Sequence, residues 1–269
     1  MIVKQNELFA PGYTPITEIH GKNPEMLLDF GILKLNSGDS WSCSLSLERA
    51  FLLITGDITF SWEGQNYRAK RYSCFDENPI TLHVPKDAKV TITAREESEI
   101  CVERSENDTL FPAKLYTQDD ITEDIFGAGV LKETSIRTVR TVFDGEIAPH
   151  SNMVIGEVIN HPGKWSSYPP HDHPQPEIYH YRLFPEQGFG VSLLDEDAYV
   201  VKNGDTSLIL PDKTHSQVAG AGYAMYYIWM IPHLPDDRWL PTTRYFRKDH
   251  EWLLEKDVKI WPERPYSKS

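Results

Sequence analysis

Short strand-like stretches separated by turn residues run through most of this chain and constrain its fold more than any other feature. In the first half, "ILKLNSGDSW", "AFLLITGDITFSWEGQNYRA" and "SEICVERS" alternate or form short apolar runs bounded by turn residues. The second half continues in the same way with "NMVIGEVINHPGKWSSYPP", "EIYHYRLF" and "YAMYYIWMIP". Helical signals are confined to 119–129 and 248–257. Such a succession of strands predicts an all-β protein made of sandwich or barrel modules.

The two halves also repeat one another faintly. The segment "LHVPKDAKVTI" can be laid on "LILPDKTHSQV" with Pro85 on Pro211. In the same way, "CSLSLERAFLLI" can be laid on "HDHPQPEIYHYR" with Glu48 on Glu177. We interpret this repeat as two related β-barrels fused in one chain.

The histidines are shared unevenly between the halves, since seven of the ten lie between residues 150 and 233. A polar, weakly patterned region from about residue 105 to 135 connects the halves. The sequence therefore predicts a first barrel over residues 1–115 that lacks metal ligands. It predicts a second, metal-binding barrel over residues 116–269, whose C-terminal segment wraps around the barrels.

Composition and charge exclude several classes of partner. Forty acidic and 27 basic side chains give a formal charge of −13, which argues against nucleic acid or an anionic membrane because both attract a basic face. No stretch approaches the ~20 apolar residues of a membrane span, and the N-terminus lacks the features of a secretory signal. Cys43, Cys74 and Cys101 form no CxxC pair and are interpreted as buried or free thiols. We therefore expect a cytoplasmic protein.

The densest group of reactive side chains lies in "SSYPPHDHPQPEIYHYRL". His171 and His173 are two residues apart and can point to one side of a strand, and Glu177 can return toward them through a tight loop. His215 follows a turn after the next strands. Three imidazoles and one carboxylate suit zinc or manganese, with iron, nickel and cobalt as alternatives, and leave positions open for water or substrate. An HxH pair alone is weak evidence, but the combination predicts a metal site.

Three neighbouring side chains are candidates for catalysis. Glu157 lies on the strand before the metal motif, where an unpaired carboxylate would be costly, so it is the first candidate for a general base or for a partner to a histidine. Tyr179 and Tyr181 share strand parity with Glu177 and are the second candidates, with a purely structural role in the core as the alternative.

Cations and one further tyrosine are candidates for substrate binding. Lys164 precedes the motif in a turn, although a solvated loop residue is the plainer interpretation. Arg182 and His180 have the opposite parity to Glu177 and are expected to face outward. Arg137 and Arg140 are interpreted as a surface pair, with carboxylate binding as the alternative. The predicted substrate-binding residues are Lys164, Arg182 and Tyr227.

The order of these motifs resembles a known family. H-x-H-x₃-E followed by a later G…P-x-x-x-H is similar to the cupin superfamily, in a bicupin arrangement of two fused jelly-roll barrels. "GKWSSYPPHDH", "EIYHYRL", "NGDTSLILPDKTHSQVAG" and "LNSGDSW" resemble the 5-deoxy-glucuronate isomerase family of inositol catabolism. That family also contains 4-deoxy-L-threo-5-hexosulose-uronate isomerase. No nucleophile elbow, P-loop or dinucleotide fingerprint competes with this resemblance.

The resemblance implies a function and a set of ligands. It makes His171, His173, Glu177 and His215 the metal ligands of an aldose–ketose isomerase that converts 5-deoxy-D-glucuronate to 5-dehydro-2-deoxy-D-gluconate. The loop "PQP" is shorter than in the family, so another deoxy-uronate such as 4-deoxy-L-threo-5-hexosulose uronate is an alternative substrate. An iron-dependent dioxygenase and a non-catalytic sugar-binding protein are the alternatives from other classes. Bicupins often pair through sheet edges, so a homo-oligomer is expected.

Overall fold

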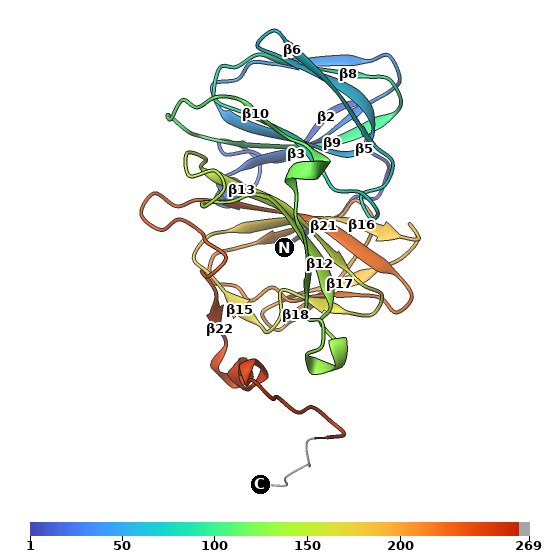
Figure 1. Cartoon of the computed structure of the whole chain (residues 1–269), viewed down its shortest axis with the longest axis vertical. Coiled ribbons are helices and arrows are strands. Elements are labelled where there is room, and N and C mark those ends of the chain that lie inside the picture. Colours follow the sequence, from blue (N-terminus) through green and yellow to red (C-terminus); the bar gives the residue numbers. More distant parts are fainter. Residues whose placement is uncertain (264–269) are drawn as a thin grey trace.

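A computed structural model describes residues 1–263 and consists almost entirely of β-strands. Two β-units are stacked, with the first half of the chain at the top of Figure 1 and the second half below it. The helices within the described residues are short 3-10 helices: η1 (Pro24–Met26), η2 (Gln118–Asp120), η3 (Leu131–Glu133) and η4 (Lys248–Leu254). The predicted all-β class is confirmed. The stretch 248–257 contains η4, whereas 119–129 overlaps only the end of η2 and continues into strand β11 (Glu123–Phe126).

The first unit is a single curled sheet of nine strands. The long strand β5 holds it together, because its first half pairs with β7 and β9 and its second half pairs with β6 and β8. The strands of this unit are β2 (Gly12–Thr17), β3 (Asp29–Leu35), β4 (Ser40–Cys43), β5 (Glu48–Trp62), β6 (Gln65–Arg71), β7 (Ile80–Val84), β8 (Val90–Ala94), β9 (Ser98–Ser105) and β10 (Lys114–Tyr116).

The second unit combines a seven-stranded sheet, in the order β1-β19-β16-β21-β13-β12-β11, with a four-stranded sheet, in the order β14-β20-β17-β18. A small ladder of β15 and β22 lies beside them. The strands are β1 (Ile2–Val3), β11 (Glu123–Phe126), β12 (Arg137–Phe143), β13 (Met153–Asn160), β14 (Trp165–Ser166), β15 (His171–Asp172), β16 (Glu177–Phe184), β17 (Gly190–Leu194), β18 (Asp197–Val201), β19 (Thr206–Ile209), β20 (Gln217–Ala219), β21 (Ala224–Pro232) and β22 (Tyr245–Phe246).

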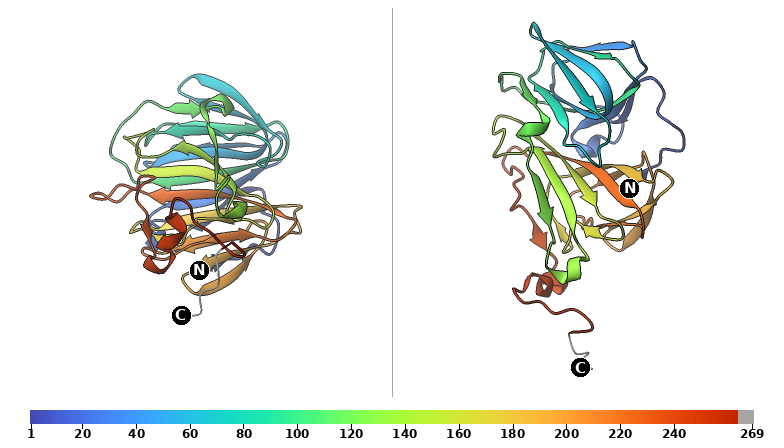
Figure 2. Two further views of the ribbon diagram at one scale, coloured as in Figure 1. Left: turned by 60° about the horizontal axis from the view of Figure 1, so that its bottom comes forward. Right: turned by 45° about the vertical axis from the view of Figure 1, so that its right-hand side comes forward.

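The strand order confirms the faint repeat. The path β10-β7-β5-β9-β3-β2 of the first unit matches the path β1-β19-β16-β21-β13-β12 of the second. The outermost strand of each path comes from outside its own half. β1, at the N-terminus, pairs with β19 of the second unit, where the N label lies in Figures 1 and 2, and β10 of the connecting region pairs with β7 of the first. The division into residues 1–115 and 116–269 stays a prediction, and residues 264–269 lie outside the described residues.

Apolar side chains form three cores. One core fills the first unit and one fills the second. The third lies between the units and draws on both, with Phe30 and Leu52 from the first and Ile155 and Ile228 from the second. The central strands of both units are therefore buried on both faces, which explains why their sequences read as continuous apolar runs rather than as clean alternation.

No helix within residues 1–263 combines the length and the apolar character that a membrane crossing requires.

Candidate metal centre and its cavity

A cavity of about 500 Å³ opens into the second unit. One wall is formed by β12, β13, β16 and β21, and the metal motif lies in the same wall. Segments far away in sequence complete it, because residues of β11 and of the chain after β21 also line the cavity. A volume of this size suits a small metabolite.

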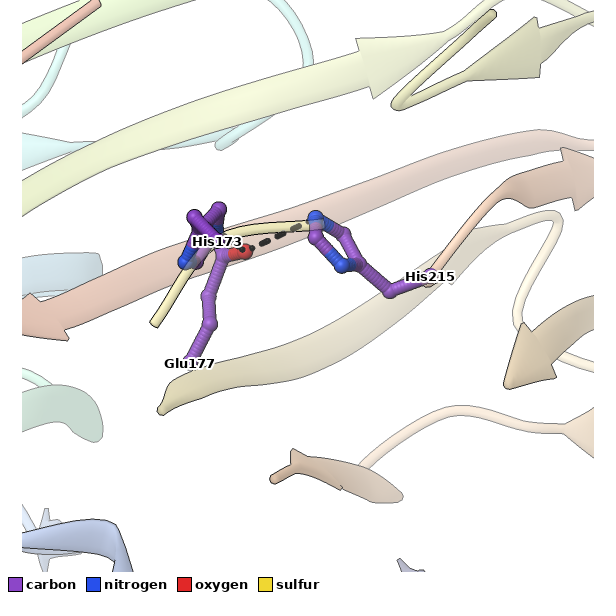
Figure 3. Close-up of side chains that lie close together, drawn as sticks. All are labelled: His173, Glu177 and His215. Carbon is purple, nitrogen blue, oxygen red and sulfur yellow. Dashed lines mark hydrogen bonds and ion pairs between the residues drawn. The ribbon is translucent and has the colours of Figure 1, made fainter. Parts of the chain in front are cut away.

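Three of the four predicted metal ligands converge in this cavity. The Glu177 Oε2 atom lies 3.2 Å from the Nε2 atoms of both His173 and His215. The ligand atoms of these three buried residues all lie within 4.8 Å of one another. Figure 3 shows the two imidazoles and the carboxylate pointing toward one another. Glu177 opens β16, while His173 and His215 come from the loops after β15 and β19, so the barrel assembles the group from three segments.

The hydrogen bonds of His173 and His215 occupy their Nδ1 atoms and leave their Nε2 atoms available to bind a metal. The Nδ1 atom of His173 is 2.9 Å from the Gln175 carbonyl oxygen, and that of His215 is 2.8 Å from the Lys213 carbonyl oxygen. Because a carbonyl only accepts, each Nδ1 carries the proton and each Nε2 presents a lone pair in the neutral ring. Two lone pairs facing a carboxylate repel it, and a cation between them removes this repulsion. The donor set therefore fits a divalent metal.

His171 stands beside this group. Its ring lies 4.9 Å from that of His215, centroid to centroid, and its Nδ1 donates to the Pro169 carbonyl oxygen at 2.9 Å. Burial, followed by the neighbouring His215, lowers the pKa of His171 to about 2, so the ring is neutral, as a ligand must be. The predicted fourth ligand therefore lines the cavity with a free Nε2, although it is not part of the compact three-residue group.

Two of the predicted tyrosines line the cavity, and the third does not. Tyr179 and Tyr227 form part of its wall, with ring centroids 4.4 Å apart. Burial raises the pKa of Tyr179 well above its ordinary value and that of Tyr227 to about 12, so both stay protonated near neutral pH. Tyr181 lies deeper in the barrel, where its hydroxyl is hydrogen-bonded at 2.8 Å to both the Ser207 hydroxyl and the Gln217 side-chain oxygen. The structure therefore brings Tyr179, but not Tyr181, to the site.

Glu157 faces away from the cavity, which corrects the expectation that it faces the metal motif. Its carboxylate accepts hydrogen bonds from both terminal nitrogens of Arg71, at 2.7 and 2.8 Å, and from the Tyr226 hydroxyl at 2.5 Å. All three side chains are fully buried between the two units. The neighbouring Val158 is the residue of β13 that lines the cavity. Glu157 therefore needs no role in chemistry to explain its burial, because it is paired.

The two basic residues that were predicted to bind substrate, Arg182 and Lys164, also lie outside the cavity. Arg182 lies on the interface face of β16, where it contacts Glu99 of the first unit at 2.8 Å and the His180 ring at 2.6 Å. Both residues face out of the second barrel as expected, but they are buried, because the first unit covers that face. Lys164 lies in the turn before β14 and does not line the cavity.

Two other arginines line the cavity instead: Arg137, for which carboxylate binding was the alternative interpretation, and Arg244, which was not a candidate. Arg137 projects into it from β12, and Arg244 lies just before β22. Arg140, the expected partner of Arg137, points to the interface and pairs with Glu123 at 2.8 Å. The alternation along "SIRTVRTV" could have indicated that these two arginines face opposite sides of the strand. No sequence signal points to Arg244, because the segment that carries it is brought to the site by tertiary packing.

The first unit has a guanidinium at the place that corresponds to Glu177. Arg49 is fully buried, and it faces the barrel interior, whereas Glu48 faces the interface and accepts from Ser151 at 2.6 Å. The alignment of Glu48 with Glu177 is therefore wrong by one residue, which moves a side chain to the opposite face. Arg49 donates to the carbonyl oxygens of Cys43, Pro85 and Ala88. A guanidinium at this place supplies no ligand atom for a cation, unlike the carboxylate of Glu177.

Comparisons with known proteins agree with this architecture. A 5-deoxy-glucuronate isomerase of Bacillus licheniformis is 29% identical over 93% of this chain and 96% of the relative. One of Bacillus subtilis is 25% identical over 94% and 97%. An IolB-like protein of Salmonella typhimurium superposes with a TM-score of 0.82 at 20% identity over 94% of this chain and 99% of that one. An oxalate decarboxylase of Lactobacillus farciminis gives 0.61 at 12% identity over 84% and 82%.

The structural neighbours confirm the cupin fold, and the sequence relatives carry the function class. Because relatives that match nearly the whole chain share the name of an isomerase, this protein is an enzyme of the isomerase kind. The model of the KduI/IolB family matches residues 1–253. The chain belongs to the KduI/IolB family.

Proposed function

We propose that this enzyme is a metal-dependent aldose–ketose isomerase that converts 5-deoxy-D-glucuronate to 5-dehydro-2-deoxy-D-gluconate in inositol catabolism. The observation that supports it most is the convergence of two imidazole nitrogens and a carboxylate oxygen at the wall of a metabolite-sized cavity. The names of the relatives supply the substrate.

His173, Glu177 and His215 would hold the metal, with His171 beside them as the fourth ligand. Two or three neutral imidazoles with one carboxylate suit zinc or manganese, and iron, nickel and cobalt are alternatives. When bound, the ion supplies a Lewis acid that stabilises negative charge on the oxygens of the substrate.

Of the three predicted catalytic residues, Tyr179 is the one that lines the cavity. An aldose–ketose isomerisation moves a proton between adjacent carbons through an enediol. The carbonyl and hydroxyl oxygens of the substrate exchange roles in this step, so a group that holds a proton must also lie near them. The hydroxyl of Tyr179 lies 2.9 Å from the Ser167 hydroxyl, and both residues line the cavity. Because burial keeps the phenol protonated, Tyr179 is suited to donate a hydrogen bond or a proton rather than to remove one. The rings of Tyr227 and Trp229 add apolar surface to the same wall.

Replacing Tyr179 with phenylalanine is expected to lower kcat by about 10²- to 10⁴-fold, the usual contribution of a general acid. The metal content of this variant should stay unchanged, because the phenol is not one of the ligand atoms. Tyr181→Phe is the matched comparison: it removes a hydroxyl that bonds only inside the barrel, so it should cost stability and leave kcat within a few-fold. Steady-state kinetics with metal analysis checks both. If Tyr181→Phe lowered kcat more than Tyr179→Phe, the general acid would be Tyr181 instead.

Proton NMR of 5-deoxy-D-glucuronate incubated in D₂O with the purified protein tests the function itself. We expect conversion to the keto acid that stops when a chelator is added and returns with zinc or manganese. Conversion only of 4-deoxy-L-threo-5-hexosulose uronate would keep the isomerase and change its substrate. Oxygen consumption would point to a dioxygenase, and binding without turnover by the metal-loaded protein would point to a sugar-binding protein.

A cytoplasmic location and a homo-oligomeric state stay predictions for this enzyme. Cys43, Cys74 and Cys101 are all buried and unpaired, which suits a reducing compartment.

A further inference from the structure

Two arginines of the cavity have no acidic partner among residues 1–263. Arg137 makes one side-chain hydrogen bond, to the Ser135 carbonyl oxygen at 2.9 Å, which leaves most of the five donors of its guanidinium free. Arg244, at the mouth, takes part in no ion pair within the same residues. The other arginines near the units behave differently, since Arg71, Arg140 and Arg182 are each paired with a carboxylate.

The surroundings of Arg137 favour an anionic ligand. Burial lowers the pKa of Arg137, and the charge of Arg244 lowers it further, so the two cations repel each other in a poorly solvated place. The Phe126 ring covers the guanidinium at 5.5 Å and cannot neutralise it. Such an arrangement is costly unless an anion from outside completes it.

No acidic residue of the cavity wall forms an ion pair with Arg137 or Arg244 within residues 1–263, although Asp124 and Glu146 also line the cavity. Asp120 accepts from the hydroxyl and the backbone of Thr117, and Asp144 accepts from the backbone amides of residues 146 and 147. Each of these carboxylates is therefore held in its own turn, away from an ion pair with Arg137 or Arg244.

Arg137 and the metal ligands lie along one wall. The His215 ring is 6.0 Å from the Tyr179 ring, and Tyr179 is 4.4 Å from Tyr227. Arg137 of β12 lines the same cavity as Tyr179 of β16 and Tyr227 of β21, so its guanidinium faces the same space as these rings. A ligand lying along this wall would reach the metal ligands with one end and the guanidinium with the other.

We propose that Arg137, with Arg244 at the mouth, binds the carboxylate of the sugar acid and makes the enzyme selective for uronates over neutral sugars. This inference rests on the proposed function for the identity of the substrate. The guanidinium of Arg137 presents the planar donor fork that a carboxylate accepts in a bidentate manner, which a lysine would not reproduce. The binding of the carboxylate sets the carbonyl end of the substrate against the metal ligands.

The test compares an acid with its neutral counterpart. The acid is 5-deoxy-D-glucuronate, and the neutral probe is 5-deoxy-D-xylo-hexose, which carries CH₂OH in place of the carboxylate. For Arg137→Gln we expect kcat/KM on the acid to fall about 100-fold, the effect of losing hydrogen bonds to a charged group. The loss of kcat/KM on the neutral sugar should be much smaller than that on the acid, and the metal content should stay that of the wild type. Arg137→Lys should restore a small part of the loss, and Arg244→Gln should cost about tenfold.

Arg95→Gln is the matched control, because Arg95 is exposed on the first unit, far from the cavity in sequence and fold. A second readout does not depend on turnover: quenching of the fluorescence of Trp229 and Trp239, which line the cavity, by each compound with metal-free protein. Wild-type protein should bind the acid more tightly than the neutral sugar, and Arg137→Gln should lose the difference.

The outcomes separate the two proposals. Equal weakening of acid and neutral sugar in Arg137→Gln, or no change in either, would overturn the carboxylate site. Absence of turnover in the wild type, with acid-selective binding that Arg137→Gln removes, would keep the carboxylate site and reject the proposed reaction. If Arg137→Gln is unfolded by circular dichroism, Arg244→Gln at the exposed position decides by the same comparison.

Discussion

Replacing Glu177 with glutamine is expected to abolish tight metal binding and to lower kcat/KM by about 10³-fold or more, because a Lewis acid supplies several kcal/mol of charge stabilisation. The amide has the same shape as the carboxylate but no charge, and the carboxylate oxygen is the atom that faces both imidazole nitrogens. Elemental analysis of the dialysed variant, together with turnover of 5-deoxy-D-glucuronate, measures both effects.

The control for this variant is Glu196→Gln, which makes the same substitution at an exposed turn between β17 and β18. It should keep its metal and its activity. A Glu177→Gln protein with full metal content and full turnover would show that the three-residue group is not the metal site. Loss of metal with unchanged turnover would show that the reaction does not depend on it.

Arg71→Ala is expected to lower the free energy of unfolding by about 3–5 kcal/mol, the usual cost of leaving one member of a buried ion pair alone. Arg71 also donates to the carbonyl oxygens of Leu53 and Glu77, so its loss leaves several buried acceptors unpaired. The remaining Glu157 carboxylate would keep only the Tyr226 hydroxyl and a distant Arg140, at 3.7 Å. Denaturant unfolding followed by circular dichroism measures the loss. Arg68→Ala removes an exposed side chain whose partner Asp57 keeps Lys70 nearby, so it should cost much less stability than Arg71→Ala.

Two further variants distinguish an effect on stability from an effect on catalysis. Arg71→Met combined with Glu157→Leu removes both charges and should recover much of the stability lost in Arg71→Ala, because no lone charge stays buried. Glu157→Gln should be less stable than wild type but turn over normally once folded and loaded with metal. A folded, metal-loaded Glu157→Gln enzyme with kcat reduced 100-fold or more would instead return Glu157 to the role of general base.

The faces of the central strands were the hardest part to predict from sequence. Glu157, His180 and Arg182 lie on strands whose two faces are both buried, one inside the barrel and one against the other unit. Alternation reports which residues share a face, and it correctly grouped Tyr179 with Glu177. It does not report which face meets the cavity, because both faces are buried and both accept apolar side chains.

The sequence by itself determined the all-β class, the two-barrel repeat, the family and the group of His173, Glu177 and His215. These depend on strand-forming stretches, turns and short spacings, which are local or repeated properties of the chain. Only the tertiary structure decided that Glu157 pairs with Arg71, that Arg49 fills the matching place in the first barrel, and that Arg137 and Arg244 share the cavity. Each of these depends on contacts between segments far apart in sequence. Such contacts are chosen by burial and charge pairing in the packed molecule, and local pattern carries no record of them.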